Sequence, residues 1–98
     1  MTLSDLPRTP DLVQVATRVI WFEPPETALT DAVQFLAYVM TYGTAEDIAI
    51  VQGYVGEAGF REALDKAPPG IFDERSWAYW NIRADRYPPP SMPARTFD

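Results

Sequence analysis

The sequence predicts an all-α fold: a compact bundle of about five short helices that ends in an extended, proline-rich tail. Apolar residues recur at helical spacing, and glycines and proline pairs divide the chain into short segments. Outside residues 12–22, no stretch alternates apolar and polar residues as a strand would. The 98 residues suit a single domain with one core. We expect disorder over residues 1–9, one helical domain over 10–86, and the extended tail over 87–98.

The first helix is expected over residues 10–20. Thr9 is placed to cap it, Pro10 occupies the first helical position, and Asp11 lies in the first turn. The apolar residues that follow have helical spacing: Leu12, Val15, Ala16, Val19 and Ile20. Because valines also favour β-structure, a strand stays open as an alternative here.

A proline pair, Pro24-Pro25, interrupts the chain after this helix, since proline lacks an N–H and disfavours helix in the residue before it. We expect Trp21 and Phe22 to fold back on the core. A second helix is expected to begin at Thr30-Asp31 and to end at Gly43. Gly43 is expected to adopt the left-handed backbone conformation that often ends a helix. The apolar face of this second helix is broad, which predicts the most buried helix. This face consists of Val33, Phe35, Leu36, Ala37, Val39 and Met40.

The middle of the chain predicts two further helices in a helix-turn-helix-like arrangement. Thr44 and Asp47 approximate a capping box at the start of the third helix. Gly53 and Gly56 suggest a turn, and the fourth helix is expected over residues 57–66. Pro68-Pro69-Gly70 stops it. Apolar residues line one face of each helix: Ile48, Val51 and Val55 in the third, then Phe60, Ala63, Leu64 and Ala67 in the fourth.

The fifth helix is expected over residues 74–85, with Asp73 or Ser76 as its cap. Trp77 and Trp80 are three residues apart and therefore share one helical face. We expect both indoles to hold the core together. The predicted core comprises Leu36, Met40, Ile48, Val51, Phe60, Leu64, Trp77 and Trp80.

Composition excludes or disfavours several classes of function. The chain has no Cys and no His, so thiolate sites are excluded and the usual general base is missing. There is no glycine-rich phosphate loop, metal-ligand spacing or nucleophile–base pair. The sequence therefore predicts no catalytic residue, metal or cofactor, and we do not expect an enzyme. No apolar run approaches the roughly 20 residues that cross a bilayer, and the N-terminus lacks signal-peptide features, so we expect a cytoplasmic protein.

Negative charge is concentrated in the middle of the chain. The formal net charge is −6, and residues 21–65 hold eight carboxylates against Arg61 alone. Such a segment repels phosphates, which makes direct nucleic-acid binding unlikely, and it attracts basic protein surfaces. The alternative interpretation is that the acids only keep a small domain soluble.

Several residues are candidate contacts for a protein partner, each with a structural alternative. The carboxylates of residues 46–47 lie in a first helical turn, where acids are favoured anyway. Aromatic and arginine side chains of the fifth helix can anchor an interface or form a solvated rim. The tail can lie in a partner's groove or fray. The candidate contacts are Glu46, Asp47, Glu57, Tyr79, Arg83, Arg86, Met92, Arg95 and Phe97.

Three runs of the chain carry a family resemblance: residues 35–48 (FLAYVMTYGTAEDI), 67–73 (APPGIFD) and 75–80 (RSWAYW). Across about residues 21–87 the chain resembles small bacterial helical proteins encoded beside AbiEii-type nucleotidyltransferases. The shared motifs are a glycine cap and an aromatic core, so no catalytic residue is carried over. The resemblance implies an antitoxin that binds and neutralises a basic nucleotidyltransferase toxin. The alternative is a DNA-binding regulator of helix-turn-helix type.

Overall fold

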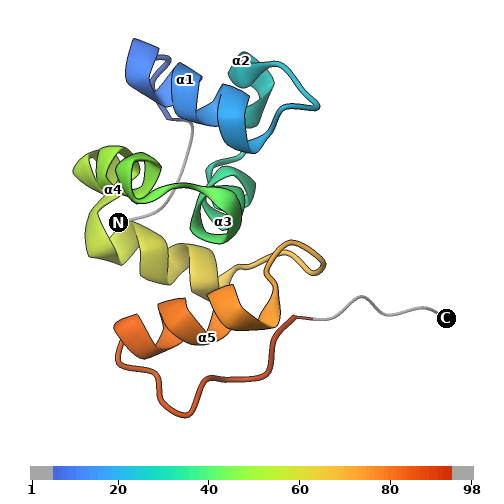
Figure 1. The fold of residues 1–98 in the computed structure, drawn as a ribbon, viewed down its shortest axis with the longest axis vertical. Helices are drawn as coiled ribbons and strands as arrows, with labels where there is room; N and C mark the ends of the chain where they lie inside the picture. The colour runs from blue at the N-terminus through green and yellow to red at the C-terminus, as the bar shows by residue number, and fades with distance from the viewer. Residues whose placement is uncertain (1–5, 94–98) are drawn as a thin grey trace, which may run out of the picture.

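A computed structural model describes residues 6–93, and it confirms an all-α fold (Figure 1). Helices α1 and α2 lie at one end, α3 and α4 in the middle, and α5 at the other end. None of the helices in the described part of the chain has the length and apolar character to cross a membrane. The helices are α1 (Pro10–Val19), α2 (Pro25–Ala28), α3 (Ala32–Tyr42), α4 (Ala45–Asp65) and α5 (Glu74–Arg83).

Helix α3 is the centre of the fold, since it contacts each of the other four helices. Its Asp31 cap accepts a hydrogen bond from the Gln34 N–H at 3.1 Å. The helix ends at Gly43, but the predicted left-handed conformation is wrong, because φ there is −71°. Glycine is needed for space instead: a Cβ at this position would lie 2.6 Å from the Val39 carbonyl oxygen.

The two neighbouring indoles of α5 join different parts of the molecule. Trp80 is buried, its Nε1 donates to the Met40 carbonyl at 2.8 Å, and its ring centroid lies 4.9 Å from that of Phe60. Trp77 donates from Nε1 to the Pro90 carbonyl at 2.7 Å. Of the predicted core, only Ile48 is half-buried. The buried members are Leu36, Met40, Val51, Phe60, Leu64, Trp77 and Trp80.

The division into helices differs from the prediction in two places. Pro25 opens the short helix α2, where we expected only an interruption. Helix α4 spans both of the helices expected on either side of the glycines and contains a single break at Gly56, with φ 67° and ψ −179°. Figure 1 shows the two halves of α4 running in different directions. The predicted helix-turn-helix is therefore a kinked helix with a one-residue break.

The segment before α1 packs on α2, although we expected disorder over residues 1–9. Leu6 is buried, and its N–H donates to the Leu29 carbonyl at 3.1 Å. Arg8 donates to the Glu26 carbonyl at 3.0 Å. The prediction is thus wrong for residues 6–9, because the Leu6 side chain, one backbone hydrogen bond and the Arg8 guanidinium hold this segment. Residues 1–5 lie outside the described residues.

Residues 87–93 of the tail have no helix or strand and run back along α5 (Figure 1). The Trp77 indole holds this segment through Pro90, and Met92 is partly buried against the core. The tail is therefore engaged with its own domain as far as it is described. Arg95 and Phe97, two of the predicted partner contacts, lie outside the described residues.

Candidate protein-binding surface

Three of the predicted partner contacts, Glu57, Arg83 and Arg86, form ion pairs within the domain. Arg83 forms an ion pair with Glu57 at 3.0 Å, and Arg86 forms one with Asp65 at 2.7 Å. Arg83 also lies over the Trp80 ring, 4.8 Å from its centroid. These side chains join the second half of α4 to α5 and to the turn after it, so they form an intramolecular rim rather than a set of open contacts.

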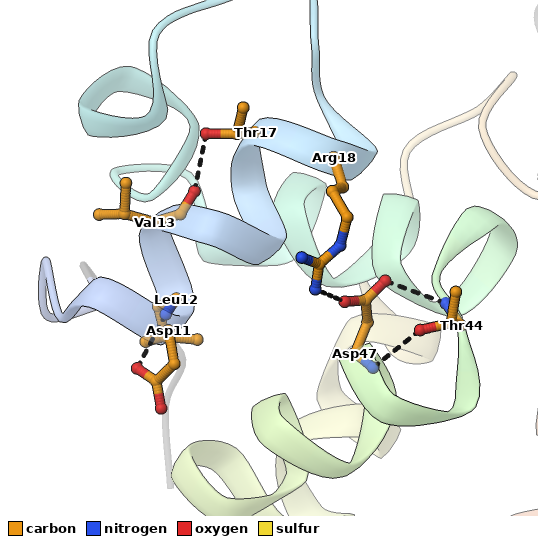
Figure 2. A network of polar contacts seen from close by, with 7 residues as sticks. All are labelled: Asp11, Leu12, Val13, Thr17, Arg18, Thr44 and Asp47. Atoms are coloured by element: carbon orange, nitrogen blue, oxygen red, sulfur yellow. Dashed lines mark hydrogen bonds and ion pairs between the residues drawn. The ribbon is translucent and has the colours of Figure 1, made fainter.

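Asp47 is wrong as a partner contact, because it is only 1% exposed and belongs to the fold. Its carboxylate accepts a hydrogen bond from the Thr44 N–H at 3.0 Å, and its own N–H donates to the Thr44 hydroxyl at 3.1 Å, which completes the predicted capping box. The Arg18 guanidinium of α1 pairs with the same carboxylate (Figure 2). Its neighbour Glu46 remains exposed.

The pKa of Asp47 reflects a competition between burial and its partners. Burial alone would raise the pKa, but hydrogen bonds from Arg18 and Thr44 and the charge of Arg18 hold the pKa below its ordinary value. The same contact raises the pKa of Arg18, so both groups are charged at neutral pH. Arg18 and Asp47 together carry no net charge, and they tie α1 to the start of α4.

Tyr79 is a predicted contact on α5 and is 56% exposed. It lines an open groove of about 480 Å³ between the start of α5 and the corner where α3 meets α4. Ile48, Ser76 and Trp80 also line this groove. The Tyr79 ring packs edge-on against Trp80 with centroids 5.3 Å apart. Tyr79 is therefore a candidate contact, but the groove that it lines has both polar and apolar side chains.

A more continuous surface lies where α1 and α3 end, and we call it the aromatic strip. It consists of Trp21, Phe22, Tyr38 and Tyr42. Successive ring centroids are 5.8, 5.7 and 6.1 Å apart, the first two pairs edge-to-face and the last stacked. Trp21 is 80% exposed, Phe22 52% and Tyr42 63%. The expectation that Trp21 and Phe22 fold back on the core is therefore wrong.

The local sequence explains how the strip forms. Trp21 and Phe22 lie in the turn between α1 and α2, ahead of Pro24. Tyr38 and Tyr42 are four residues apart on α3, so they are neighbours on one side of the helix. Contact between α1 and α3 then joins the two pairs. An open groove of about 360 Å³ lies beside the rings and is also lined by Arg18 and Val19.

Sequence reasoning missed the strip, because helical spacing alone does not separate its tyrosines from buried residues. Tyr38 and Tyr42 fall on the side of their helix opposite to Val33, Leu36 and Met40. However, Phe35 falls beside Tyr42 on that side and is fully buried. Trp21 and Phe22 lie in a turn, which has no periodicity from which to judge burial.

The chemistry of the strip suits binding. Contiguous exposed apolar surface is uncommon on small monomers and is typical of sites that contact another macromolecule. Trp and Tyr are also the side chains that most often dominate interface energetics. Within residues 6–93, no group of three or more carboxylate, imidazole or thiol side chains is placed to hold a metal ion.

Comparisons with known proteins add no relative. No protein-family model matches the chain, and comparisons with curated proteins and with solved structures find no significant match.

Proposed function

We propose that the chain is a protein-binding domain that acts in the cytoplasm as the antitoxin of a toxin–antitoxin pair. In this proposal it neutralises a nucleotidyltransferase-type toxin by direct contact and performs no catalysis itself. The antitoxin role comes from the family resemblance of residues 35–48, 67–73 and 75–80. The exposed aromatic strip supports an apolar surface as the mode of binding.

The observation that carries the proposal is the exposure of the aromatic strip. Trp21 is 80% exposed in a domain whose other two tryptophans are buried. Leaving an indole, a phenyl ring and a phenol side by side in water forgoes roughly 25 cal/mol for every Å² of apolar surface left unburied. A partner that covers the strip recovers that free energy, which supports binding as the purpose of the surface.

The charge of the chain supports a basic partner. Eight carboxylates lie in residues 21–65, and this segment includes both halves of the strip. An enzyme that acts on nucleotides or tRNA presents cations to phosphates, so its active-site face is electrostatically complementary to this one. Occupying that face would block the toxin.

The direct test is co-expression with the product of the adjacent gene, followed by co-purification and a growth assay. We expect a stable complex and rescued growth. The double variant Trp21→Ala/Phe22→Ala should lose both, while its own thermal midpoint stays near that of the wild type because these rings are exposed. Tyr79→Ala, on the other groove, serves as the comparison and should retain both.

Two results would count against the proposal. Absence of both complex and rescue with the wild-type chain would exclude the antitoxin role. A complex that survives Trp21→Ala/Phe22→Ala and is lost with Tyr79→Ala would move the binding surface to the groove beside α5.

The second candidate function is a DNA-binding regulator, suggested by the two halves of α4 on either side of Gly56. Its second half carries Glu57, Glu62 and Asp65 against Arg61, a balance that repels phosphates. A mobility-shift assay with the DNA upstream of its own gene decides this function. Retardation at low salt would favour it, and we expect none.

A further inference from the structure

We infer that the aromatic strip recognises arginine side chains on a basic segment of a partner protein. This inference rests on the proposed function, because it names the chemistry that the same surface would bind. It is more specific than general apolar contact, since it requires positive charge and a planar group in the ligand. Three features of the surface carry it: open π faces, unpaired carboxylates and converging helix ends.

The first feature is the accessibility of electron-rich rings. Cations are attracted to the face of Trp most strongly, and to those of Tyr and Phe less so. Trp21 and Tyr42 are the two most exposed members of the strip. The domain already makes one contact of this kind, since the Arg83 guanidinium lies 4.8 Å from the Trp80 ring centroid. Trp21, at 80% exposure, leaves its ring accessible to a guanidinium from a partner.

The second feature is the charge around the strip. Arg18, the cation that lines the groove, is paired with Asp47 and contributes no net positive charge. Glu23 directly follows Phe22, and the exposed Glu46 is near enough to act electrostatically on Arg18. Among residues 6–93, neither Glu23 nor Glu46 forms an ion pair. The surroundings of the strip are therefore net negative.

The third feature is the direction of two helices. α1 ends at Val19 and α3 ends at Tyr42, so both carboxyl termini lie at the strip. Carbonyl groups at a helix end carry a partial negative charge that attracts cations near the last turn. The opposite, positive end of α4 begins nearby at Ala45, but Asp47 and Glu46 occupy its first turn and compensate for it.

These features together favour arginine over the alternative ligands. A purely apolar segment gains nothing from the carboxylates, and a nucleic acid is repelled by them. Arginine uses all three features, because its guanidinium stacks on aromatic faces and also donates paired hydrogen bonds to carboxylates. Lysine offers a point charge without the planar group and should bind more weakly.

The test uses a fluorescently labelled synthetic peptide of about a dozen residues with an arginine at every third position. A second peptide carries citrulline, the uncharged isostere, at the same positions, and a third carries lysine. We expect the arginine peptide to bind about tenfold or more tightly than the citrulline peptide by fluorescence anisotropy. Affinity should also fall as salt rises from about 50 to about 300 mM, because the charges become screened.

Variants locate the binding on the strip. Trp21→Ala/Tyr42→Ala should weaken binding of the arginine peptide about tenfold. Glu23→Gln/Glu46→Gln should weaken it by about threefold to tenfold. The matched control is Glu74→Gln/Asp85→Asn, which removes the same amount of charge from the α5 region and should change the affinity by less than about twofold. Asn is chosen because Asp85 has a positive φ of 64°, which Asn tolerates.

Equal binding of the arginine and citrulline peptides would overturn the inference. So would an affinity that falls equally with both acid-to-amide pairs, since the attraction would then be the diffuse charge of the chain. Self-association that Trp21→Ala abolishes would identify a second copy as the occupant instead. A toxin complex that needs Trp21 but ignores salt and Glu23→Gln/Glu46→Gln would leave the proposed function standing and remove this inference alone.

Discussion

At the scale of single residues, Asp47 combines two roles that are usually separate. It is the third residue of α4 and closes the capping box with Thr44, and it also receives the Arg18 guanidinium from α1. A capping box is a local motif, whereas the contact with Arg18 links residues 29 positions apart. One carboxylate therefore both starts a helix and positions its neighbour.

We expect Asp47→Asn to destabilise the domain by about 1.5–3 kcal/mol, because the buried amide carries no charge and offers one acceptor oxygen where Arg18 and Thr44 need two. Glu46→Gln is the matched control on the adjacent residue, which is exposed, and it should change stability by less than about 0.5 kcal/mol. Chemical denaturation of both variants at neutral pH gives the comparison. Equal effects would contradict the role of Asp47.

Trp80 and Trp21 also form a pair of one buried and one exposed residue. Trp80 is 3% exposed, packs on Phe60 and donates to the Met40 carbonyl, so Trp80→Ala should cost about 3–5 kcal/mol. Trp21→Ala, at a position 80% exposed, should change stability by less than about 0.5 kcal/mol. Denaturant midpoints measure both. A midpoint that Trp80→Ala leaves unmoved would show that its indole is not part of the core.

At the scale of elements, the kink in α4 is set by a single glycine. Gly56 has φ 67° and ψ −179°, a region of backbone conformation that is almost restricted to glycine. The kink directs the first half of α4 toward α1 and α3, as Figure 1 shows, while the second half runs beside α5. Side chains from both halves, Val51 and Phe60 among them, can then enter one core.

Two glycines of α4 provide a matched pair for testing this account. Gly56→Ala meets no neighbouring atom, but its positive φ should cost about 1–3 kcal/mol. Gly53→Ala also meets no neighbouring atom, lies within the helix and is exposed, so it should stabilise by about 0.5–1 kcal/mol. Thermal denaturation of the two variants separates backbone strain from crowding. Thermal midpoints that shift in the same direction in both variants would contradict the role of the Gly56 backbone conformation in the kink.

Local signals explain which elements the sequence could predict. The caps Asp31, Thr44 and Asp73 each accept a hydrogen bond from the N–H three residues ahead, so their effect is readable from a few positions. Thr9 is the exception. It occupies the cap position of α1, but its hydroxyl bonds the Asp11 carboxylate at 2.6 Å and contacts Tyr54 of α4, so tertiary contact replaces the cap.

At the scale of the whole molecule, the sequence predicted which helical residues are buried, but not the contacts that depend on how the helices pack together. The helical spacing of apolar residues in α3 and α5 identified Leu36 and Trp80 as core residues, and both are buried. The ion pair of Arg18 with Asp47 joins α1 to α4, and no spacing within either helix indicates it. Whether Trp21 is covered depends on how α1 docks on α3. The candidate site was missed for that reason.

Stability toward acid is also a property of the whole molecule, because three carboxylates hold its parts together. Asp47 pairs with Arg18 of α1, Asp11 accepts from Tyr54 of α4 at 2.8 Å, and Asp73 caps α5. The pKa of Asp11 is lowered mainly by its Thr9 and Tyr54 hydrogen bonds, and that of Asp73 by hydrogen bonds from Ser76. The pKa of Asp47 is lowered as well, despite its burial.

A folded-state pKa below the unfolded value of about 3.9 means that the native state binds fewer protons. The stabilisation is therefore complete above about pH 5 and is lost as the pH falls through the folded-state values. Without His, the chain should show a nearly constant thermal midpoint between about pH 6 and 8 and a steep fall below about pH 4. Scanning calorimetry across this range measures both.

Protonation also relieves repulsion among the acids of a chain with a net charge of −6, which acts in the opposite direction. We expect the specific contacts to dominate, because they are direct hydrogen bonds, whereas exposed charges are screened by salt. Asp47→Asn supplies the control: it should lower the neutral-pH midpoint and flatten the fall in acid. A wild-type midpoint that holds or rises down to about pH 3 would show that repulsion outweighs the three carboxylates.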